Sequence, residues 1–498
     1  MSRVRPAVLA NTRIGSRLIL AGGLLLLTAC SVGPRYARPS APEAPQYKEL
    51  PPNWKAAQPN DQLAKGKWWG VFQDPQLNQL EEQVAVSNQT LKAAQAQFEQ
   101  ARALVRANRA GYYPTITAGV AASRNRVSTA RANGQFISSN PYTDLQIPVD
   151  LSYEVDVWGR VRHTVQAARA NAQATAGDLE SVNLSLHAEL AADYFQLRTL
   201  DADAQLLDST VESYTRALEL TQSRYSGGVA SQVDVAQAQT VLETTRAQAI
   251  DVRVARAQFE HAIAVLIGEA PAKFSLPSMP LNSTPPVIPI GLPSELLERR
   301  PDIAAGERRM AVANEQIGIA TAAFYPTISI SATGGFEGNS ITNWFVAPGG
   351  FVAVGASAVE TIFDAGRRRA ITDQAKSAYD QSVANYRQTV LTAFQEVEDN
   401  LVAIRLLEDE ARTQQGAVQA AQRSLALSNN RYKGGVANYL EVTTAQTFAL
   451  SDERTLVEIA GRRMAASVQL IKALGGGWDA SSLPVVQNNK PSSTSSGQ

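Results

Sequence analysis

The chain consists of two similar halves, and this duplication limits the possible folds more than any other feature. Residues 224–230, with sequence RYSGGVA, recur 207 positions later at 431–437 as RYKGGVA. Two further matches keep the same order: YPTIT at 113 recurs as YPTIS at 325, and GRVR at 159 recurs as GRRR at 366. A period of about 207–212 residues is far longer than that of a solenoid repeat. The sequence therefore predicts that a whole structural unit has been duplicated.

The N-terminus has the features of a processing signal, so residues 1–29 are set apart from the fold. Four arginines and no acidic residue precede a short apolar run at 18–27, which is too short to cross a bilayer as a helix. The run ends in LTAC, whose Cys30 is the only cysteine of the chain. This ending resembles the bacterial lipobox, which implies cleavage before Cys30 and its lipidation. The alternative is a free thiol in an ordinary secretory signal.

Proline-rich segments divide the remainder of the chain. Residues 30–73 are expected to form a lipidated tether, and residues 271–293 a crossing between the two halves. The two repeats are then 74–270 and 294–478. Residues 479–498, rich in serine and asparagine, are expected to be a disordered tail.

Each repeat is predicted to run helix, strand, strand, helix, helix. The expected strands, 114–125 and 145–158 and then 326–337 and 351–363, alternate apolar and polar residues. Lengths near ten residues suit tilted membrane strands, although a half-buried soluble sheet alternates equally well. The fourth strand is less regular, because Glu360 falls in register with apolar positions of its copy. The edge of a bilayer is one position that would fit it.

The helical part of each repeat is unusually long. Helices are expected at 160–226 and 366–433, returning as 229–267 and 436–474, and each of the two longer segments is free of proline. As helix, each spans roughly 100 Å at about 1.5 Å per residue. Apolar residues recur every 3.6 positions on average, which predicts packing surfaces, not a ligand site. Each long helix ends at a Gly-Gly pair, where a chain can stop and reverse. These pairs are Gly227 with Gly228, and Gly434 with Gly435.

Four strands per chain cannot close a barrel, and an open sheet in lipid leaves backbone groups unpaired. Two chains would supply eight strands and an interior filled by side chains, whereas three would supply twelve and leave a lumen. Polar strand faces favour water inside. The expected fold is therefore a mixed α/β membrane protein, with a trimeric 12-stranded β-barrel continued by a long periplasmic α-helical barrel.

No arrangement of residues indicates catalysis. The mature chain has 42 basic and 46 acidic residues, so it has no electrostatic reason to bind nucleic acid. His163, His187 and His261 lack metal-ligand spacing, and no P-loop, nucleophile elbow or dinucleotide fingerprint occurs. We expect each histidine to lie on a helix surface, and we expect no enzyme activity, cofactor or metal.

Motifs along nearly the whole chain resemble the TolC/OprM-type outer-membrane factors, specifically their NodT-like lipoprotein branch. The motifs are VGP at 32–34 with Tyr36, WW at 68–69 with Phe72 and Asp74-Pro75, Tyr113-Pro114, GLPSELLERRPDI at 291–303, and ALGGGW at 473–478. The resemblance implies a passive efflux channel of the cell outer membrane, a lipid-anchored homotrimer in contact with outer-membrane lipid. It also implies a periplasmic adaptor and an inner-membrane pump, of the proton-driven RND type.

The resemblance also implies a gate at the periplasmic helix tips, with the adaptor contacting the Gly-Gly turns. When the family's gate residues are carried over by their position after the Gly-Gly turns, Tyr432 would face Asp234. Leu440, Glu441 and Thr444 would lie on the helix that constricts the channel. The alternative is that the two carboxylates only cap or solvate the helix starts.

Two other functions remain open from the sequence. A conduit for type I protein or peptide secretion shares the same architecture. A non-channel periplasmic scaffold lipoprotein is compatible with the strand alternation, although the paired long arms and the family motifs disfavour it.

Overall fold

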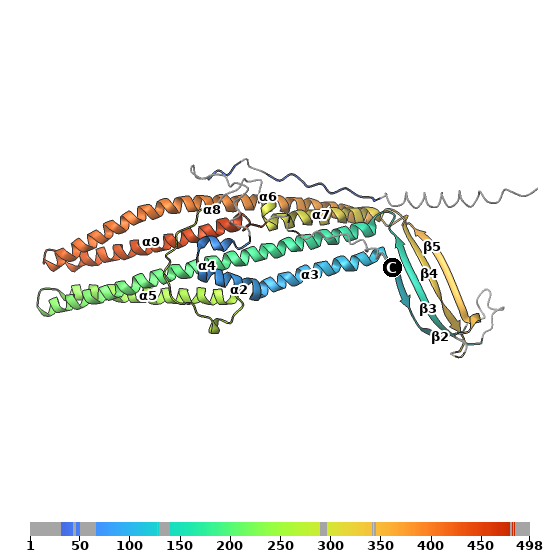
Figure 1. Ribbon diagram of the computed structural model, residues 1–498, viewed down its shortest axis with the longest axis horizontal. Coiled ribbons are helices and arrows are strands. Elements are labelled where there is room, and N and C mark those ends of the chain that lie inside the picture. The colour runs from blue at the N-terminus through green and yellow to red at the C-terminus, as the bar shows by residue number, and fades with distance from the viewer. Residues whose placement is uncertain are drawn as a thin grey trace, which may run out of the picture.

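The structure is a computed structural model, and it describes residues 31–42, 46–49, 66–126, 128, 140–288, 296–340, 342, 345–478, 481 and 483. The expected signal peptide, Cys30 and most of the expected tail lie outside these residues. The molecule is elongated, with a β-sheet at one end and long helical hairpins reaching the other end (Figure 1). None of the described helices combines the length and the apolar character that a membrane span requires.

Both repeats run from short helices through β-strands to a long helix and a returning helix, although the first strand of the first repeat is divided into β1 and β2. The first contains η2 (Trp68–Phe72), α2 (Pro75–Ser87), α3 (Gln89–Arg109), β1 (Thr115–Ala118), β2 (Ala121–Asn125), β3 (Tyr142–Val155), α4 (Arg160–Ser226) and α5 (Gln232–Leu266). The second contains α6 (Leu296–Arg299), α7 (Pro301–Ala322), β4 (Thr327–Gly338), β5 (Gly350–Val359), α8 (Arg367–Lys433) and α9 (Tyr439–Ala473).

The long helices α4 and α8 contain 67 residues each, so each is about 100 Å long. The returning helices α5 and α9 begin three residues later than expected. Their N-caps explain the difference, because the side chains of Ser231 and Asn438 accept hydrogen bonds from the backbone N–H of Asp234 and Glu441. The residues between the Gly-Gly pairs and these caps therefore form the turn.

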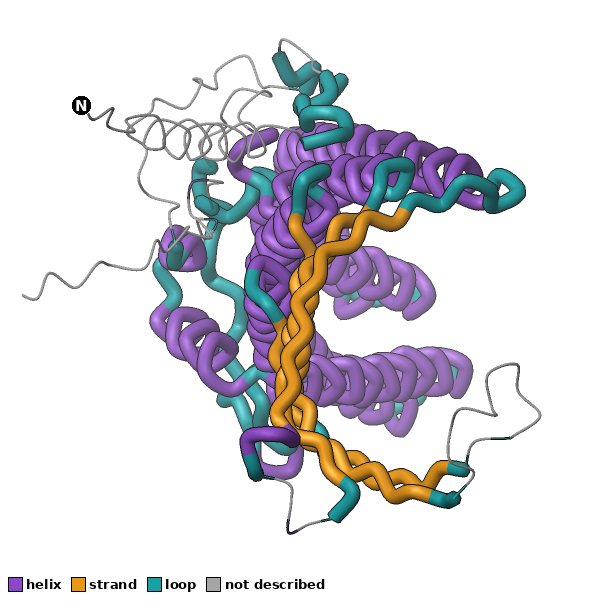
Figure 2. Tube along the Cα trace, turned by 90° about the vertical axis from the view of Figure 1, so that its right-hand side faces the viewer, coloured by secondary structure: helices purple, strands orange, loops and turns teal. Residues whose placement is uncertain are grey.

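The strands form one antiparallel sheet in the order β1-β3-β4-β5, with β2 also paired to β3. The expected strand 114–125 is interrupted, although β1 and β2 share one register on β3. Pro148 of β3 causes the interruption, because it stands opposite Gly119 and has no N–H to donate. Figure 2 shows that the sheet is a curved, open arc.

The expected strand 351–363 is too long, because β5 ends at Val359, where its partner β4 begins at Thr327. Glu360 therefore follows the strand and does not share its alternation. Its carboxylate accepts a hydrogen bond of 3.0 Å from Arg368 in the first turn of α8. This ion pair gives the irregular residue a local explanation at the junction of sheet and helix.

The largest hydrophobic core lies midway along the molecule, where η2 and α2 pack against α4, the middle of α8 and the C-terminal ends of α5 and α9. Trp68, Leu77 and Tyr194 are among its fully buried side chains. Asp74 caps α2 and also accepts a 2.7 Å hydrogen bond from the Tyr194 hydroxyl. The core therefore fixes the short outer elements to the long helix.

Residues 276–281, the crossing strap, are held on the same core by buried charges. Asp201 is fully buried and accepts hydrogen bonds from Arg198, from Arg256 and from the Met279 N–H. Arg198 in turn donates to the Pro277 carbonyl. The connection between the repeats is thus fastened to α4 and α5.

Candidate gate at the helix tips

Both helical hairpins end in the same glycine turn. Gly228 has φ of +72° and Gly435 has φ of +73°, a left-handed conformation that favours glycine. In each turn the next valine N–H donates to the carbonyl of an arginine, Val229 to Arg224 at 2.9 Å and Val436 to Arg431 at 3.0 Å. The duplicated sequence thus builds two equivalent tips.

The two hairpins of the chain are in contact at their tips, where Leu218 and Ala238 of the first pack in one apolar cluster with Tyr432 and Tyr439 of the second. The Arg224 guanidinium of α4 lies 4.8 Å from the ring centroid of Tyr432 on α8, and its Nη1 donates to the Lys433 carbonyl at 3.2 Å. Tyr432 is only 6% exposed, and its ring packs edge-on against Tyr439 at 5.1 Å. We call this set of contacts the tip link. Burial raises the pKa of the Tyr439 phenol, which keeps this side chain neutral.

Arg224 is not among the site residues predicted from the sequence, although comparison of the two repeats points to it. Arg224 is the copy of Arg431, which stands at the same distance before its Gly-Gly pair. In the second repeat this arginine turns to the first turn of α9 instead, where it lies 3.7 Å from Glu441. The two copies of one residue therefore make different contacts, and only the first bridges the hairpins.

The expected pair of Tyr432 and Asp234 is not formed within one chain. The Asp234 carboxylate accepts the Ser231 N–H at 2.9 Å in a capping box at the start of α5. The Tyr432 hydroxyl is buried and has no hydrogen-bond partner among the described residues. Within the chain, Asp234 thus acts as a helix cap, which is the alternative left open by the sequence.

The remaining candidate residues lie on the first two turns of α9. Leu440 is 53% exposed, and Glu441 and Thr444 are also exposed. The Thr444 hydroxyl donates to the Leu440 carbonyl, and the Glu441 N–H is capped by Asn438. An apolar side chain and a carboxylate therefore project from the same tip that carries Tyr432.

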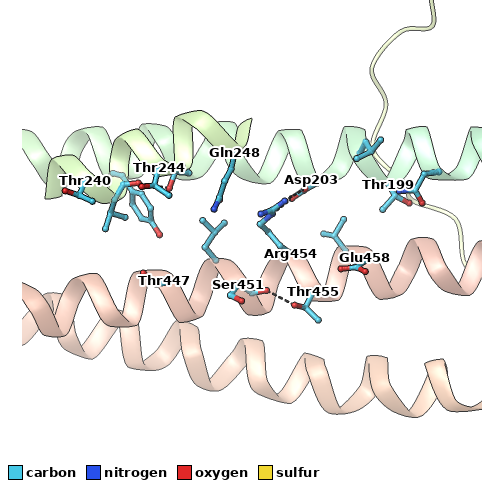
Figure 3. Close-up of a pocket in the computed structure, with 17 residues that line it drawn as sticks. Thr199, Asp203, Thr240, Thr244, Gln248, Thr447, Ser451, Arg454, Thr455 and Glu458 are labelled. Atoms are coloured by element: carbon cyan, nitrogen blue, oxygen red, sulfur yellow. Dashed lines mark hydrogen bonds and ion pairs between the residues drawn. The ribbon is translucent and has the colours of Figure 1, made fainter. Parts of the chain in front are cut away.

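Above the tips, a cavity of about 700 Å³ with both polar and apolar lining residues lies between α4, α5 and α9 (Figure 3). Arg454 of α9 makes a two-pronged ion pair with Asp203 of α4, with both distances 2.9 Å. On α4, Gln196 and Asp203 line this cavity. Tyr194 and Arg198 lie about 180° away around the same helix, and they contact the N-terminal end of α2. The cavity therefore opens on the face of α4 opposite to α2.

Two histidines expected on helix surfaces are buried, which corrects that expectation. His187 lies 2.5 Å from Glu81 and stacks on Trp69 at 4.5 Å. Burial raises the pKa of Glu81 to about 9 and lowers the pKa of His187 to about 4. His163 lies 2.5 Å from Glu315. Only His261 is exposed, and the described residues contain no cluster arranged to hold a metal.

The sequence matches known proteins along both repeats. A family model described as outer membrane efflux protein matches residues 80–269 and 292–476. The toluene efflux pump outer membrane protein TtgC of Pseudomonas putida is 32% identical over 466 residues, covering 93% of this chain and 96% of that protein. The pyoverdine export outer membrane protein OpmQ of Pseudomonas aeruginosa is 30% identical over 465 residues, covering 93% and 97%.

Solved structures share the fold over nearly the same length. The outer-membrane channel OprN superposes with a TM-score of 0.82 at 29% identity, covering 90% of this chain and all of that one. The open state of the Neisseria gonorrhoeae MtrE outer membrane channel gives 0.80 at 27% identity, covering 91% and 99%.

Proposed function

Because this chain belongs to the outer membrane efflux protein family, we propose that it is the outer-membrane channel of a tripartite efflux system. The family match falls on both repeats, and the likeness to outer-membrane channels extends over nine-tenths of the chain. The observation that carries the proposal is the pairing of an open sheet with two helical arms of equal length. Such a chain is one segment of a tube, not a closed unit.

The tube is completed by three copies. Within one chain the sheet ends at two free edges, and β5 exposes Val352, Val354 and Val359. An open sheet is unstable in lipid because the backbone N–H and C=O groups along its edges have no partners, and three copies supply twelve strands, counting β1 and β2 as one. Chemical cross-linking should therefore stop at three chains. A clean monomer in mild detergent would contradict the barrel.

The cargo would pass along the concave side of the arc. The cavity between α4, α5 and α9 supports this, because the threonine, glutamine and charged side chains in its lining tolerate a water-filled lumen. In this proposal transport through the channel is passive, and a proton-driven inner-membrane pump supplies the energy. A periplasmic adaptor, seated near the Gly-Gly turns, joins the pump to the channel. Small molecules are the proposed cargo.

Two further features complete the proposal. Cys30 carries acyl chains, and the following Ser31, where inner-membrane lipoproteins usually have aspartate, directs the protein to the outer membrane. At the other end, Asp234, Tyr432, Leu440, Glu441 and Thr444 surround the periplasmic aperture in three copies. Carboxylates repeated about a symmetry axis concentrate negative potential, as they do in charged selectivity rings.

Single-channel recording tests the function directly. Purified protein in planar bilayers should give discrete conductance steps, and variants with a broken tip should conduct more often. A trimer that stays silent even with its tip residues replaced would refute the channel. Deleting the gene and measuring susceptibility to drugs, dyes and detergents would then identify the cargo, whereas loss of a secreted protein would favour type I secretion.

A further inference from the structure

Ser31 and Val32, the first residues after the proposed lipidation site, make hydrogen bonds to residues at the junction of the sheet and the helices. The Val32 N–H donates to the Trp158 carbonyl at 3.1 Å, just before α4. The Val32 carbonyl lies 2.8 Å from Nε2 of His163, and the Ser31 hydroxyl lies 3.0 Å from the same nitrogen. His163 is on the first turn of α4 and is buried. One imidazole nitrogen thus contacts two consecutive residues of the N-terminus.

The other ring nitrogen of His163 is also occupied. Its Nδ1 lies 2.5 Å from the Glu315 carboxylate of α7, 152 residues further along the chain. A carbonyl and a carboxylate are both acceptors, so each ring nitrogen must donate, and the imidazole is protonated. The hydrogen bond to Glu315 raises the pKa of His163 although burial opposes it, and Asp156 in the turn before α4 adds a smaller contribution.

Two glycines let the N-terminal segment approach closely. A Cβ on Gly33 would lie 2.8 Å from the Gly318 Cα, and a Cβ on Gly318 would lie 2.7 Å from the His163 ring. Further along, the Pro34 carbonyl accepts from Asn314 at 3.1 Å, and Arg38 donates to the Tyr386 hydroxyl at 3.1 Å. Residues 31–42, the N-terminal strap, therefore contact α4, α7 and α8.

We propose that His163 and Glu315 form a docking site for Ser31 and Val32, and that this docking fixes the lipid-bearing Cys30 at the junction of β3 and α4. The proposal rests on the proposed lipidation. Ser31 directly follows the lipidated residue, and consecutive Cα atoms are about 3.8 Å apart, so the docking of Ser31 brings the acyl chains to this junction. The end of the barrel and the anchor therefore meet the membrane at one level.

Aromatic residues mark the same level. The Trp158 indole donates to the Pro326 carbonyl at 2.8 Å, and its ring stacks on Tyr325 at 4.7 Å. Tryptophan and tyrosine concentrate at membrane–water interfaces, where one part of the ring is apolar and the other is hydrated. The strap contacts both repeats, so the anchor reaches this position only after both have folded.

A spin label on the strap tests the docking in the full-length protein. The exposed Arg35 is replaced by cysteine, since a lipidated Cys30 offers no free thiol, and label mobility is recorded with rising pH. The pKa of His163 is raised, so docking is complete below about pH 6.5 and is lost as pH rises through the folded pKa. The mobile fraction should therefore increase toward alkaline pH.

Two variants and a control make the result specific. His163→Ala should raise the mobile fraction at about pH 6 by tenfold or more, since it removes the hydrogen bonds between the charged imidazole and the strap. Glu315→Gln should move the pH midpoint downward, and His261→Ala, on the exposed face of α5, should change nothing. A label equally immobile in His163→Ala and in the parent at every pH would overturn the docking.

Mass spectrometry of the N-terminal peptide separates the docking from the lipidation on which it rests. Acyl chains on Cys30 together with a mobility that depends on His163 support the whole proposal. A peptide without acyl chains overturns the anchoring role and the proposed lipidation, even where the label still responds to His163.

Discussion

Replacing Arg224 by alanine should open the channel, because it removes the two contacts that Arg224 contributes to the tip link between the hairpins. The guanidinium lies over the Tyr432 ring at 4.8 Å and donates to the Lys433 carbonyl at 3.2 Å. A cation–π contact at a partly exposed site contributes about 0.5–1 kcal/mol, and the hydrogen bond adds a similar amount after solvent screening. We therefore use about 1 kcal/mol per chain for the stabilisation of the closed state that Arg224 contributes. Three chains opening together would lose about 3 kcal/mol, a shift of roughly 150-fold in the closed-to-open ratio.

Substitutions at Tyr432 separate this reasoning from a gate held by its hydroxyl. The hydroxyl has no partner within the chain, so Tyr432→Phe keeps the tip link and should conduct like the parent. Tyr432→Leu removes the ring and should behave like Arg224→Ala. Arg246→Ala is the matched control, since that side chain pairs with Glu243 on its own helix.

The assay is open probability in planar bilayers, with antibiotic susceptibility of cells as a second readout. Unchanged open probability in both Arg224→Ala and Tyr432→Leu would refute the tip link. Opening by Tyr432→Phe as large as that by Tyr432→Leu would show that the hydroxyl closes the gate, through a partner such as Asp234 of a neighbouring chain.

Three further predictions concern stability. Burial raises the pKa of Glu81, which hydrogen-bonds to His187, to about 9. The protonated Glu81 side chain therefore contributes its full stability below about pH 4.5, and this contribution falls as pH rises toward 9. Glu81→Gln should flatten this decline in thermal melts. Gly177→Leu should lower the Tm, because even a Cβ at this position would lie 2.9 Å from a carbonyl of α7, and overpacking costs about 1–3 kcal/mol. Gly416→Ala is the control and should not lower the Tm, because the space around Gly416 is open. Asp201→Asn should cost about 3–5 kcal/mol by leaving two arginines without their buried partner, and limited proteolysis should then cut the crossing strap first.

Local features of the sequence were sufficient for the long helices. The proline-free segments between Gly159 and Gly227, and between Gly366 and Gly434, delimit α4 and α8 to within one residue. Helix ends depend on nearby residues, so glycine and proline mark them well. The strands were less predictable, because Pro148 breaks the strand opposite to it, and the sequence alone does not say which residue pairs with Gly119.

The contacts of the site depended on residues far apart in sequence. His163 and His187 looked like isolated surface residues because their partners, Glu315 and Glu81, lie 152 and 106 positions away. Arg224 could have been found by comparing the repeats, but its contact with α8 is a property of the folded pair of hairpins. Buried polar groups must find partners, yet their identity is set by packing and not by spacing along the chain.

The equal length of α4 and α8 has a consequence for how such a protein can change. Because both arms contain 67 residues, their turns lie at one level, and six turns in a trimer would lie in one plane. A heptad inserted in both helices of one hairpin alone would displace its turn by roughly 10 Å and leave a staggered rim. Matching a wider or narrower periplasm therefore requires the same insertion or deletion in both copies. In the duplicated chain, the length of one helical hairpin thus constrains the length of the other, and the two can change only together.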